Sequence, residues 1–447
     1  MLRKPISALR GTLTAIALLC CISSTGAGVL TLPQAYALAL ERDATLRAAR
    51  AATAAANEQL PQAQGQWLPN VSLSASRSYN SLLRDPTNSL STGAEQYFSY
   101  NQTLNLRQPL LRKPLSDNLT QAQFKVDDAQ AGLVREVQNL SVRLVGAYLD
   151  HLLSLDQLAL VEVQQKLIHS QLDAAQKSFA AGSGIRTDVD EAQARLDLNK
   201  AQHLEARLQV AMTLRQLEAI VNEPVERLAP MNAQFMLAQP FEERSLNGWI
   251  ELSEAESPEI KSLQARLEVA RLEIAKAQGA HLPTIDAVAQ VMRSGSENVL
   301  ALSSNYTNRV IGLQLNLPLY SGGMINSSVR QAVASFEQAQ ELLEATRRDL
   351  GVRVNREYRG IVEGQLRIRA QEQALVSAEQ LVISSQRSFK AGNRTLIDVL
   401  NAEQQKQVVV RDLMQARYVY FLAKVKLMAL CGLDVTALLS QLSPANP

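Results

Sequence analysis

Two stretches of this 447-residue chain decide its fold: FAAGSGIRTDV at 179–189 and FKAGNRTLIDV at 389–399. They share Phe-x-Ala-Gly followed by Asp-Val, at a constant offset of 210 residues. A glycine that follows a helical pattern is typical of a helix end. Each motif also lies within a long stretch without internal proline, 115–223 or 319–443, and proline would break a helix. The sequence therefore predicts that each motif is a tight turn between two long helices.

The rest of the chain repeats with nearly the same offset. Trp67-Leu68-Pro69 recurs as His281-Leu282-Pro283, and Gln108-Pro109-Leu110 is matched by Leu317-Pro318-Leu319. A period near 210 residues is too long for a solenoid, so it indicates two copies of one large unit. Each copy has an alanine-rich helical pattern, a segment of period two, a very long helical pattern and a return helix.

The helix lengths predict a rod-shaped molecule. The long patterns, Leu115–Ala181 and Met324–Ala391, each correspond to about 100 Å of helix at 1.5 Å per residue. The first copy also has two shorter patterns, Pro33–Gly65 and Thr187–Asn222. Placed end to end, they equal one long helix in length, and the same holds in the second copy. Each copy is therefore expected to supply one continuous and one interrupted helical strand. Gly432 is expected to end the last helix.

The two segments of period two, about 67–111 and 281–320, predict β-hairpins. Apolar residues alternate with polar ones over about 9–11 residues per strand, the length of a transmembrane β-strand. Aromatic residues are only 4% of the chain, yet they concentrate here, as they do at membrane interfaces. Two soluble hairpins that cover a sheet are the alternative. Four strands cannot close a barrel, which needs about eight, so a membrane location requires several copies to pool their strands.

The first 27 residues are typical of a signal peptide. A basic segment with Arg3, Lys4 and Arg10 precedes an apolar run, Leu13–Ile22. This run is too short to span a membrane as a helix. Small residues ending at Ala27 form a cleavage site. Lipidation would require a small residue directly before one of the two cysteines of this segment. Neither cysteine has one, so the mature protein is expected not to be lipidated. Because no later stretch is apolar enough for a membrane helix, any crossing is expected to use β-strands.

Composition and motifs exclude several classes of function. A net charge of +2 provides no basic surface for nucleic acid. Three cysteines, two of them adjacent, exclude a disulfide framework and a zinc-type spacing. No nucleotide-binding, metalloprotease or serine-hydrolase motif is present. The sequence therefore predicts no catalytic residue, no metal site and no cofactor, and the chain is not expected to be an enzyme.

Together, the signal peptide, the doubled unit and the Phe-x-Ala-Gly…Asp-Val turns resemble the TolC family of outer-membrane efflux and secretion channels. The resemblance implies a fold that is mainly α with β. Long α-helical hairpins would form a trimeric periplasmic α-barrel, and four strands per protomer would contribute to a 12-stranded transmembrane β-barrel. The chain then divides into the signal peptide 1–27, the first repeat 28–222, an equatorial linker 223–247, the second repeat 248–432 and a C-terminal tail 433–447.

The resemblance also implies a function. It indicates a passive channel in the outer membrane of a Gram-negative bacterium that extends into the periplasm, as the exit duct of a tripartite efflux pump or a type I secretion system. The expected partners are further copies in a homotrimer, a periplasmic adaptor protein, an inner-membrane transporter and outer-membrane lipid. An exported coiled-coil scaffold without a pore is the alternative. The cargo stays open among drugs, metals and protein, although the missing lipidation site favours secretion.

The resemblance places the periplasmic entrance at the second turn. Asp398 matches a ring of aspartates, and Asn401 stands where the family has a second aspartate. Arg394 matches an arginine that helps to lock the closed state, whereas Phe389 replaces a tyrosine. Residues at i and i+3 share one helix face, so Asp398 and Asn401 are both expected to face the lumen. Cation selectivity would then be weaker than with two carboxylate rings.

The residues by themselves support a second interpretation of these turns. Thr395 followed by Asp398 is a capping-box pattern, and so is Thr187 with Asp190. The resemblance favours the gate, and one carboxylate can serve both roles. The adaptor protein is expected to contact the two turns at Phe179, Gly182, Asp188 and Gly392.

Overall fold

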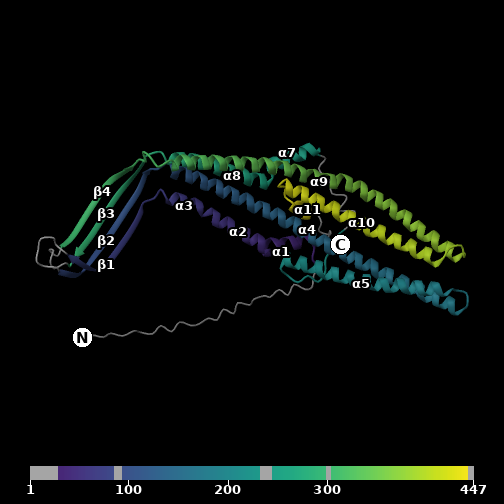
Figure 1. The fold of residues 1–447 in the computed structure, drawn as a ribbon. Coiled ribbons are helices and arrows are strands. Elements are labelled where there is room, and N and C mark those ends of the chain that lie inside the picture. Colours follow the sequence, from purple (N-terminus) through teal and green to yellow (C-terminus); the bar gives the residue numbers. More distant parts are fainter. Residues whose placement is uncertain (1–28, 85–92, 232–243, 298–303, 441–447) are drawn as a thin grey trace, which may run out of the picture.

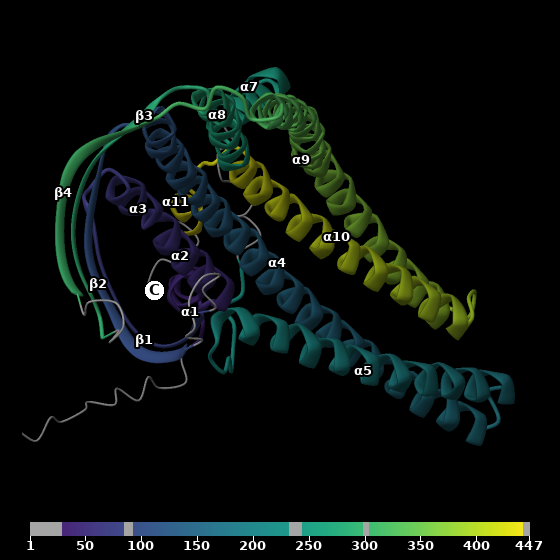
Figure 2. The same ribbon diagram turned by 60° about the vertical axis from the view of Figure 1, so that its left-hand side comes forward.

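The computed structural model describes residues 29–84, 93–231, 244–297 and 304–440. Figures 1 and 2 show an elongated molecule with a β-sheet at one end and two helical turns at the other. The expected signal peptide, the part of the equatorial linker that contains Pro240 and the end of the expected tail lie outside the described residues.

Four strands form one antiparallel sheet in the order β1-β2-β3-β4. Their bounds are β1 Asn70–Arg84, β2 Gly93–Leu111, β3 Thr284–Ser296 and β4 Ser304–Asn316. The prediction of two hairpins is confirmed, but the strands have 13 to 19 residues and not 9–11. The reason is visible in β1. Beyond Ala75 its alternation continues with polar and aromatic side chains, so the contrast on which the prediction depends is lost.

Two long helical hairpins make up the body of the molecule. They pair α4, Lys113–Ala180, with α5, Arg186–Val221, and α9, Met324–Lys390, with α10, Leu396–Leu430. The predicted rod-like helices are confirmed to within two residues at each end. α4 also contains an 18-residue window of mean hydropathy 1.2, so one helix is more apolar than the sequence analysis expected. That helix packs along α5, α8 and α10.

Each copy has the expected interrupted helical strand, but the first of its two shorter helices is itself divided, although one helix was expected there. Residues of the first copy form α1 Leu32–Arg42, α2 Ala44–Asn57 and α3 Gln59–Gly65. Asp43 breaks this run because its carboxylate accepts the backbone N–H of Leu46 at 2.8 Å and so caps a new helix. In the second copy, α7 Leu246–Glu256 ends before Pro258, which begins α8.

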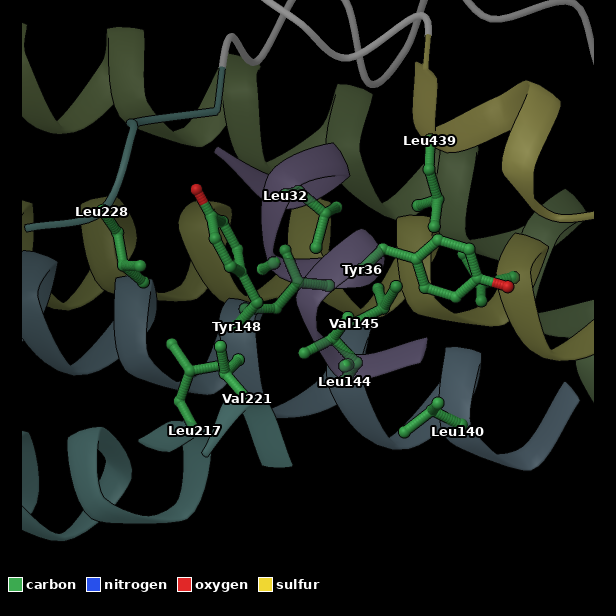
Figure 3. Packing of buried hydrophobic residues seen from close by; sticks show 14 of the residues in the cluster. Leu32, Tyr36, Leu140, Leu144, Val145, Tyr148, Leu217, Val221, Leu228 and Leu439 are labelled. Carbon is green, nitrogen blue, oxygen red and sulfur yellow. The ribbon is translucent and has the colours of Figure 1, made fainter. Parts of the chain in front are cut away.

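A hydrophobic core lies at the waist of the rod (Figure 3). α1, α4, α5 and α10 meet there, together with α11, Thr436–Ser440. Tyr36, Tyr148 and Phe421 are buried in it, so some of the few aromatic residues lie outside the hairpins and fill this core. The Tyr148 hydroxyl lies 2.8 Å from the carbonyl oxygen of Ala229 and 3.1 Å from that of Leu30. These contacts hold the described part of the equatorial linker against α4.

One buried carboxylate joins the sheet to the helices. Asp286 in β3 is 2% exposed and accepts hydrogen bonds from Arg107 in β2 and from Arg112, the residue before α4. The two guanidinium contacts are 2.5 and 2.6 Å long. Charge-assisted bonds of this kind fix geometry as well as adding stability. The cluster therefore sets the direction in which α4 leaves the sheet. The described chain also includes Gly432, whose φ of +67° ends α10 as predicted.

Candidate functional site

The two turns predicted from the repeated motif have one backbone design. Gly182 and Gly392 adopt φ values of +75° and +78°, which glycine adopts without steric cost. In each turn the residue after the glycine donates its N–H to the carbonyl oxygen five residues earlier, at 3.0 and 2.9 Å. This is the Schellman arrangement that satisfies the free carbonyls of a helix end. The repeated sequence motif thus ends a helix at both turns.

Both turns expose large apolar side chains. Phe179 and Phe389 are 44% and 42% exposed, and Ile185 beside the first turn is 62% exposed. Asp188 lies in the first turn of α5, as Asp398 does in α10. Figure 1 places both turns at the end of the molecule that is far from the sheet. Of the residues expected to contact an adaptor, Phe179, Gly182 and Asp188 therefore lie at the tip of the α4–α5 hairpin, and Gly392 lies at the tip of the α9–α10 hairpin.

The second turn has a complete capping box. The Asp398 carboxylate accepts the backbone N–H of Thr395 at 2.9 Å and its hydroxyl at 2.8 Å, while the Asp398 N–H donates to the Thr395 hydroxyl oxygen at 3.3 Å. These bonds, with a smaller contribution from the charge of Arg394, hold the pKa of Asp398 below its usual value. Asp398 is consequently ionised at neutral pH and fixed in position.

The first turn lacks the cap that the sequence suggested, so the prediction for Thr187 is wrong. α5 begins at Arg186, and its N-cap is Ile185, whose side chain makes no capping bond. At the offset of 210 residues, Ile185 corresponds to Thr395. Thr187 lies one position inside the helix, where its hydroxyl cannot reach back as a cap. The two turns therefore differ in how firmly the following helix is started.

Arg394 and Asn401 have partners in different parts of the chain. The Arg394 guanidinium donates to the buried Ser385 hydroxyl at 2.8 Å, within the α9–α10 hairpin. The Asn401 side-chain oxygen accepts from Arg195 of α5 at 2.9 Å, across to the other hairpin. Within one chain, Asp398 and Asn401 thus share no partner. The shared lumenal face expected for them stays a prediction.

Leu400 is the main apolar contact between the two hairpins near their tips. It is buried against Ile168 and Leu172 of α4 and Ala192 and Leu196 of α5. Sequence reasoning missed both this contact and Arg195. Periodicity shows which residues of a helix are apolar, but it does not show which other hairpin they meet.

Above this contact, the seam between the hairpins is polar. A groove of about 480 Å³ is lined by six glutamines of three helices, with Glu205 and Arg411 and with the apolar residues Leu160, Val161, Ala206 and Val408 between them. The glutamines are Gln157 and Gln164 of α4, Gln202 and Gln209 of α5, and Gln404 and Gln407 of α10. Next to it, a void of about 50 Å³ adjoins Asn199. This asparagine is 1% exposed, and neither atom of its side-chain amide has a hydrogen-bond partner among the described residues.

The fold and the repeated unit match a known family. The sequence pattern of the family described as outer membrane efflux protein covers residues 35–223 and 249–433. The chain belongs to this family. Its two matched stretches correspond to the two structural copies and exclude most of the equatorial linker.

Individual relatives agree with this assignment. The alkaline protease secretion protein AprF of Pseudomonas aeruginosa is 33% identical, over 90% of this chain and 84% of its own length. The proteases secretion protein PrtF of Dickeya chrysanthemi is 30% identical over 89% and 87%. The outer membrane protein TolC of Escherichia coli K12 is 30% identical over 90% and 82%.

Solved structures show the same fold at lower identity. The outer membrane protein VceC of Vibrio cholerae superimposes with a TM-score of 0.75 at 20% identity, covering 90% of this chain and 96% of its own. CusC, described in terms of transmembrane channel formation, gives 0.78 at 15% identity, with coverage of 90% and 92%. The chain is thus an outer-membrane exit duct for efflux or type I secretion and not an enzyme. The scaffold without a pore is not supported.

The difference between the two turns is testable with a matched pair of variants. Thr395→Ala should lower the opening free energy of the first turn of α10 by about 1 kcal/mol, because an N-cap side chain is lost. Thr187→Ala should not lower the opening free energy of the first turn of α5 and should raise it by up to about 0.7 kcal/mol, since alanine is the better helix former. Hydrogen exchange of the purified protein measures both. Equal effects at the two turns would contradict the assigned caps.

Proposed function

We propose that three copies of this chain form one channel, with a gate at the turn between α9 and α10. The observation that carries the proposal is the open sheet. β1 and β4 each have one edge without a partner strand in the described chain, and lipid leaves no water to satisfy an open edge. Three copies would supply twelve strands, the number that the family resemblance implies. The helical hairpins would then surround a continuous duct.

The proposed cargo is a secreted protein. This branch is supported by two relatives at 30% and 33% identity that are named as secretion proteins for proteases. Both cover more than four-fifths of their own length in the alignment. The duct would work with an inner-membrane transporter and a periplasmic adaptor that supply the energy and the contact with the tips.

The gate would combine a charged ring with links between the hairpins. In a trimer, three copies of Asp398 at the second turn would present three carboxylates, whose ionisation the capping bonds favour. Arg394 would stiffen the α9–α10 turn through Ser385. The Arg195–Asn401 bond would hold α10 against α5 in the closed arrangement.

The seam between the hairpins supports opening by separation of α10 from α5. Among the described residues, a small apolar cluster around Leu400 and the Arg195–Asn401 bond join them near the tips, and half of the residues that line the adjacent groove are glutamines that water can solvate. The amide of Asn199 has no partner among the described residues, and the adjoining void is large enough for a water molecule. A polar group that bonds water more readily than protein favours a seam that can be hydrated when the hairpins separate.

The gate is tested by Asp398→Asn, which removes the charge and keeps an oxygen that can cap the helix. In planar bilayers the wild-type channel should conduct, and multivalent cations added on the periplasmic side should block it. The variant should need at least about tenfold more cation, since the attraction of three carboxylates is lost. Block of the wild type should still be present at the ordinary aspartate pKa of about 4 and weaken only at lower pH, because the bonds from Thr395 hold the pKa of Asp398 below that value.

Asp188→Asn is the matched control, because Asp188 holds the corresponding position in the other turn. Its block should equal that of the wild type. A protein that does not conduct would contradict the channel, and unchanged block in Asp398→Asn would contradict the charged ring.

The adaptor is proposed to bind the exposed apolar side chains of the tips. Phe179 and Phe389 stand at the C-terminal ends of α4 and α9, next to Gly182 and Gly392. Exposed phenylalanines beside rigid turns offer the fixed apolar anchors that interfaces favour. Asp188 would add a charge beside the first anchor.

Secretion and docking are tested together in a P. aeruginosa strain that lacks AprF. The present chain should restore the release of alkaline protease, whereas the double variant Phe179→Ser and Phe389→Ser should lower it at least about tenfold, as expected for interface anchors. Leu204→Ser, at an apolar position in α5 that is 65% exposed and so more accessible than either phenylalanine, should leave release unchanged. Failure of the wild type would contradict the secretion branch, and full activity of the double variant would contradict docking at the tips.

A further inference from the structure

The two faces of the sheet differ in polarity. Paired residues across the strands place Val71, Leu106, Ala289 and Ile311 in one row. The next row on the same face begins with Leu73, Leu104 and Val291. Ser72, Asn105 and Gln290 form the intervening row on the other face. In a membrane channel the apolar face contacts lipid, and the polar face lines the water-filled interior.

Three arginines lie on the lipid-facing side. Arg77 of β1 lies on the same face as Val71 and Leu73, because an even number of residues separates them. Arg293 of β3 lies on the same face as Val291 for the same reason. Arg309 of β4 is the cross-strand partner of Val291. All three side chains belong to exposed residues. An arginine in contact with hydrocarbon is costly, so these residues need a polar environment at their height in the membrane.

Their positions along the strands place them at one height. Arg77 lies seven residues beyond Asn70, the helix-proximal end of β1, and Arg309 lies seven residues from Asn316, the helix-proximal end of β4. Arg293 lies nine residues beyond the start of β3. At about 3.3 Å per residue and a tilt of about 40°, this is roughly 18–23 Å above the strand ends.

An apolar band in a barrel is about 25 Å tall. Because the helices extend into the periplasm, the arginines lie at the far rim of that band. This is the headgroup region of the outer leaflet. Nearby aromatic residues agree with that height, since Phe98 and Tyr79 pack together with ring centroids 5.1 Å apart, and aromatic girdles mark membrane interfaces.

The guanidinium groups are available to a ligand. Among the residues that the structure describes, none of the three arginines forms an ion pair, although Arg107 of β2 and Arg112, just beyond its end, do so with Asp286. Arg77 lies over the Phe98 ring at 4.9 Å, which orients its guanidinium and leaves its N–H donors free. Arg293 and Arg309 are diagonal neighbours on adjacent strands, about 7–8 Å apart in backbone position. Two like charges this close favour a shared anion.

A flat platform adjoins the arginines. Gly295 leaves room for the Tyr100 ring, which would collide with any Cβ at that position, and the Tyr100 hydroxyl donates to Asn305 at 2.8 Å. The aromatic ring thus covers the glycine and closes the surface between β2 and β4. A planar, partly apolar surface edged by arginines suits a sugar ring that carries phosphate.

We propose that Arg77, Arg293 and Arg309 form a binding site for the phosphate groups of a phosphorylated glycolipid in the outer leaflet. A phosphate group can accept two hydrogen bonds from one guanidinium. The acyl chains of the glycolipid would lie on the apolar rows below. The site anchors the barrel at a fixed depth. It is separate from the duct and its gate, so it goes beyond the proposed function and rests only on the assignment of the lipid-facing side.

The test uses the full mature protein in phosphatidylethanolamine nanodiscs, titrated with bis-phosphorylated lipid A. Native mass spectrometry counts the bound lipid. The triple variant Arg77→Gln, Arg293→Gln and Arg309→Gln should bind about 100-fold more weakly, at about fivefold per arginine. Arg367→Gln, which removes an exposed arginine of α9 far from the sheet, should bind as the wild type does.

A second arm varies the lipid and needs no variant. The wild type should bind fully dephosphorylated lipid A more weakly than the bis-phosphorylated form, by the same factor of about 100. Equal binding by the triple variant, or equal binding of the two lipids, would overturn the site. If the triple variant does not insert, the corresponding lysine variant keeps the charge and should retain most of the affinity. Conductance is recorded for every variant, so a failed channel is distinguished from a failed lipid site.

Discussion

The structure depends on one constraint: a β-sheet in lipid cannot leave backbone N–H and C=O groups unpaired. The single chain supplies four strands, in sequential order, with β1 at one edge and β4 at the other. Their outward side chains are apolar over several rows, so the sheet belongs in the membrane. Neither edge is satisfied until another copy pairs with it. Assembly is therefore a condition of the fold in its membrane.

The rest of the molecule follows from how the sheet is continued. Asp286, held by Arg107 and Arg112, fixes the direction of α4 at the base of the sheet. From there the helices run as two hairpins past an apolar waist to two glycine-terminated turns. A large apolar cluster fills the waist, whereas half of the residues that line the seam nearer the tips are glutamines. The proposed gate therefore lies at the more polar end of the helical hairpins.

The sequence predicts much of this architecture because its signals are local and repeated. Proline-free stretches and the Phe-x-Ala-Gly motif locate the long helices and their turns to within two residues. The break at Asp43 was missed because an alanine-rich pattern continues across it. The break at Pro258 was missed although the proline marks it. The ends of the strands were missed because the alternation there is polar.

The site was predictable only in part. Asp398 was located by its motif, and the competing interpretation of it as a cap is what the chain shows. The same pattern at Thr187 was misleading, because the N-cap of α5 is Ile185, two residues before Thr187. Arg195 and Leu400 act between hairpins that are distant in sequence. One-dimensional periodicity contains no information on such contacts.

Disulfide crosslinking across the sheet edges tests the central claim most directly. A cysteine replaces Ser74 in β1, and a second one is scanned through Asn308, Val310 and Gly312 of β4, on the same face of the sheet. The native Cys431 is buried with its pKa raised to about 12, so it should not interfere. The account predicts that oxidation of outer-membrane fractions gives linked species of up to three chains and none larger. No crosslink at any position, or a ladder that ends at two chains or continues beyond three, would contradict it.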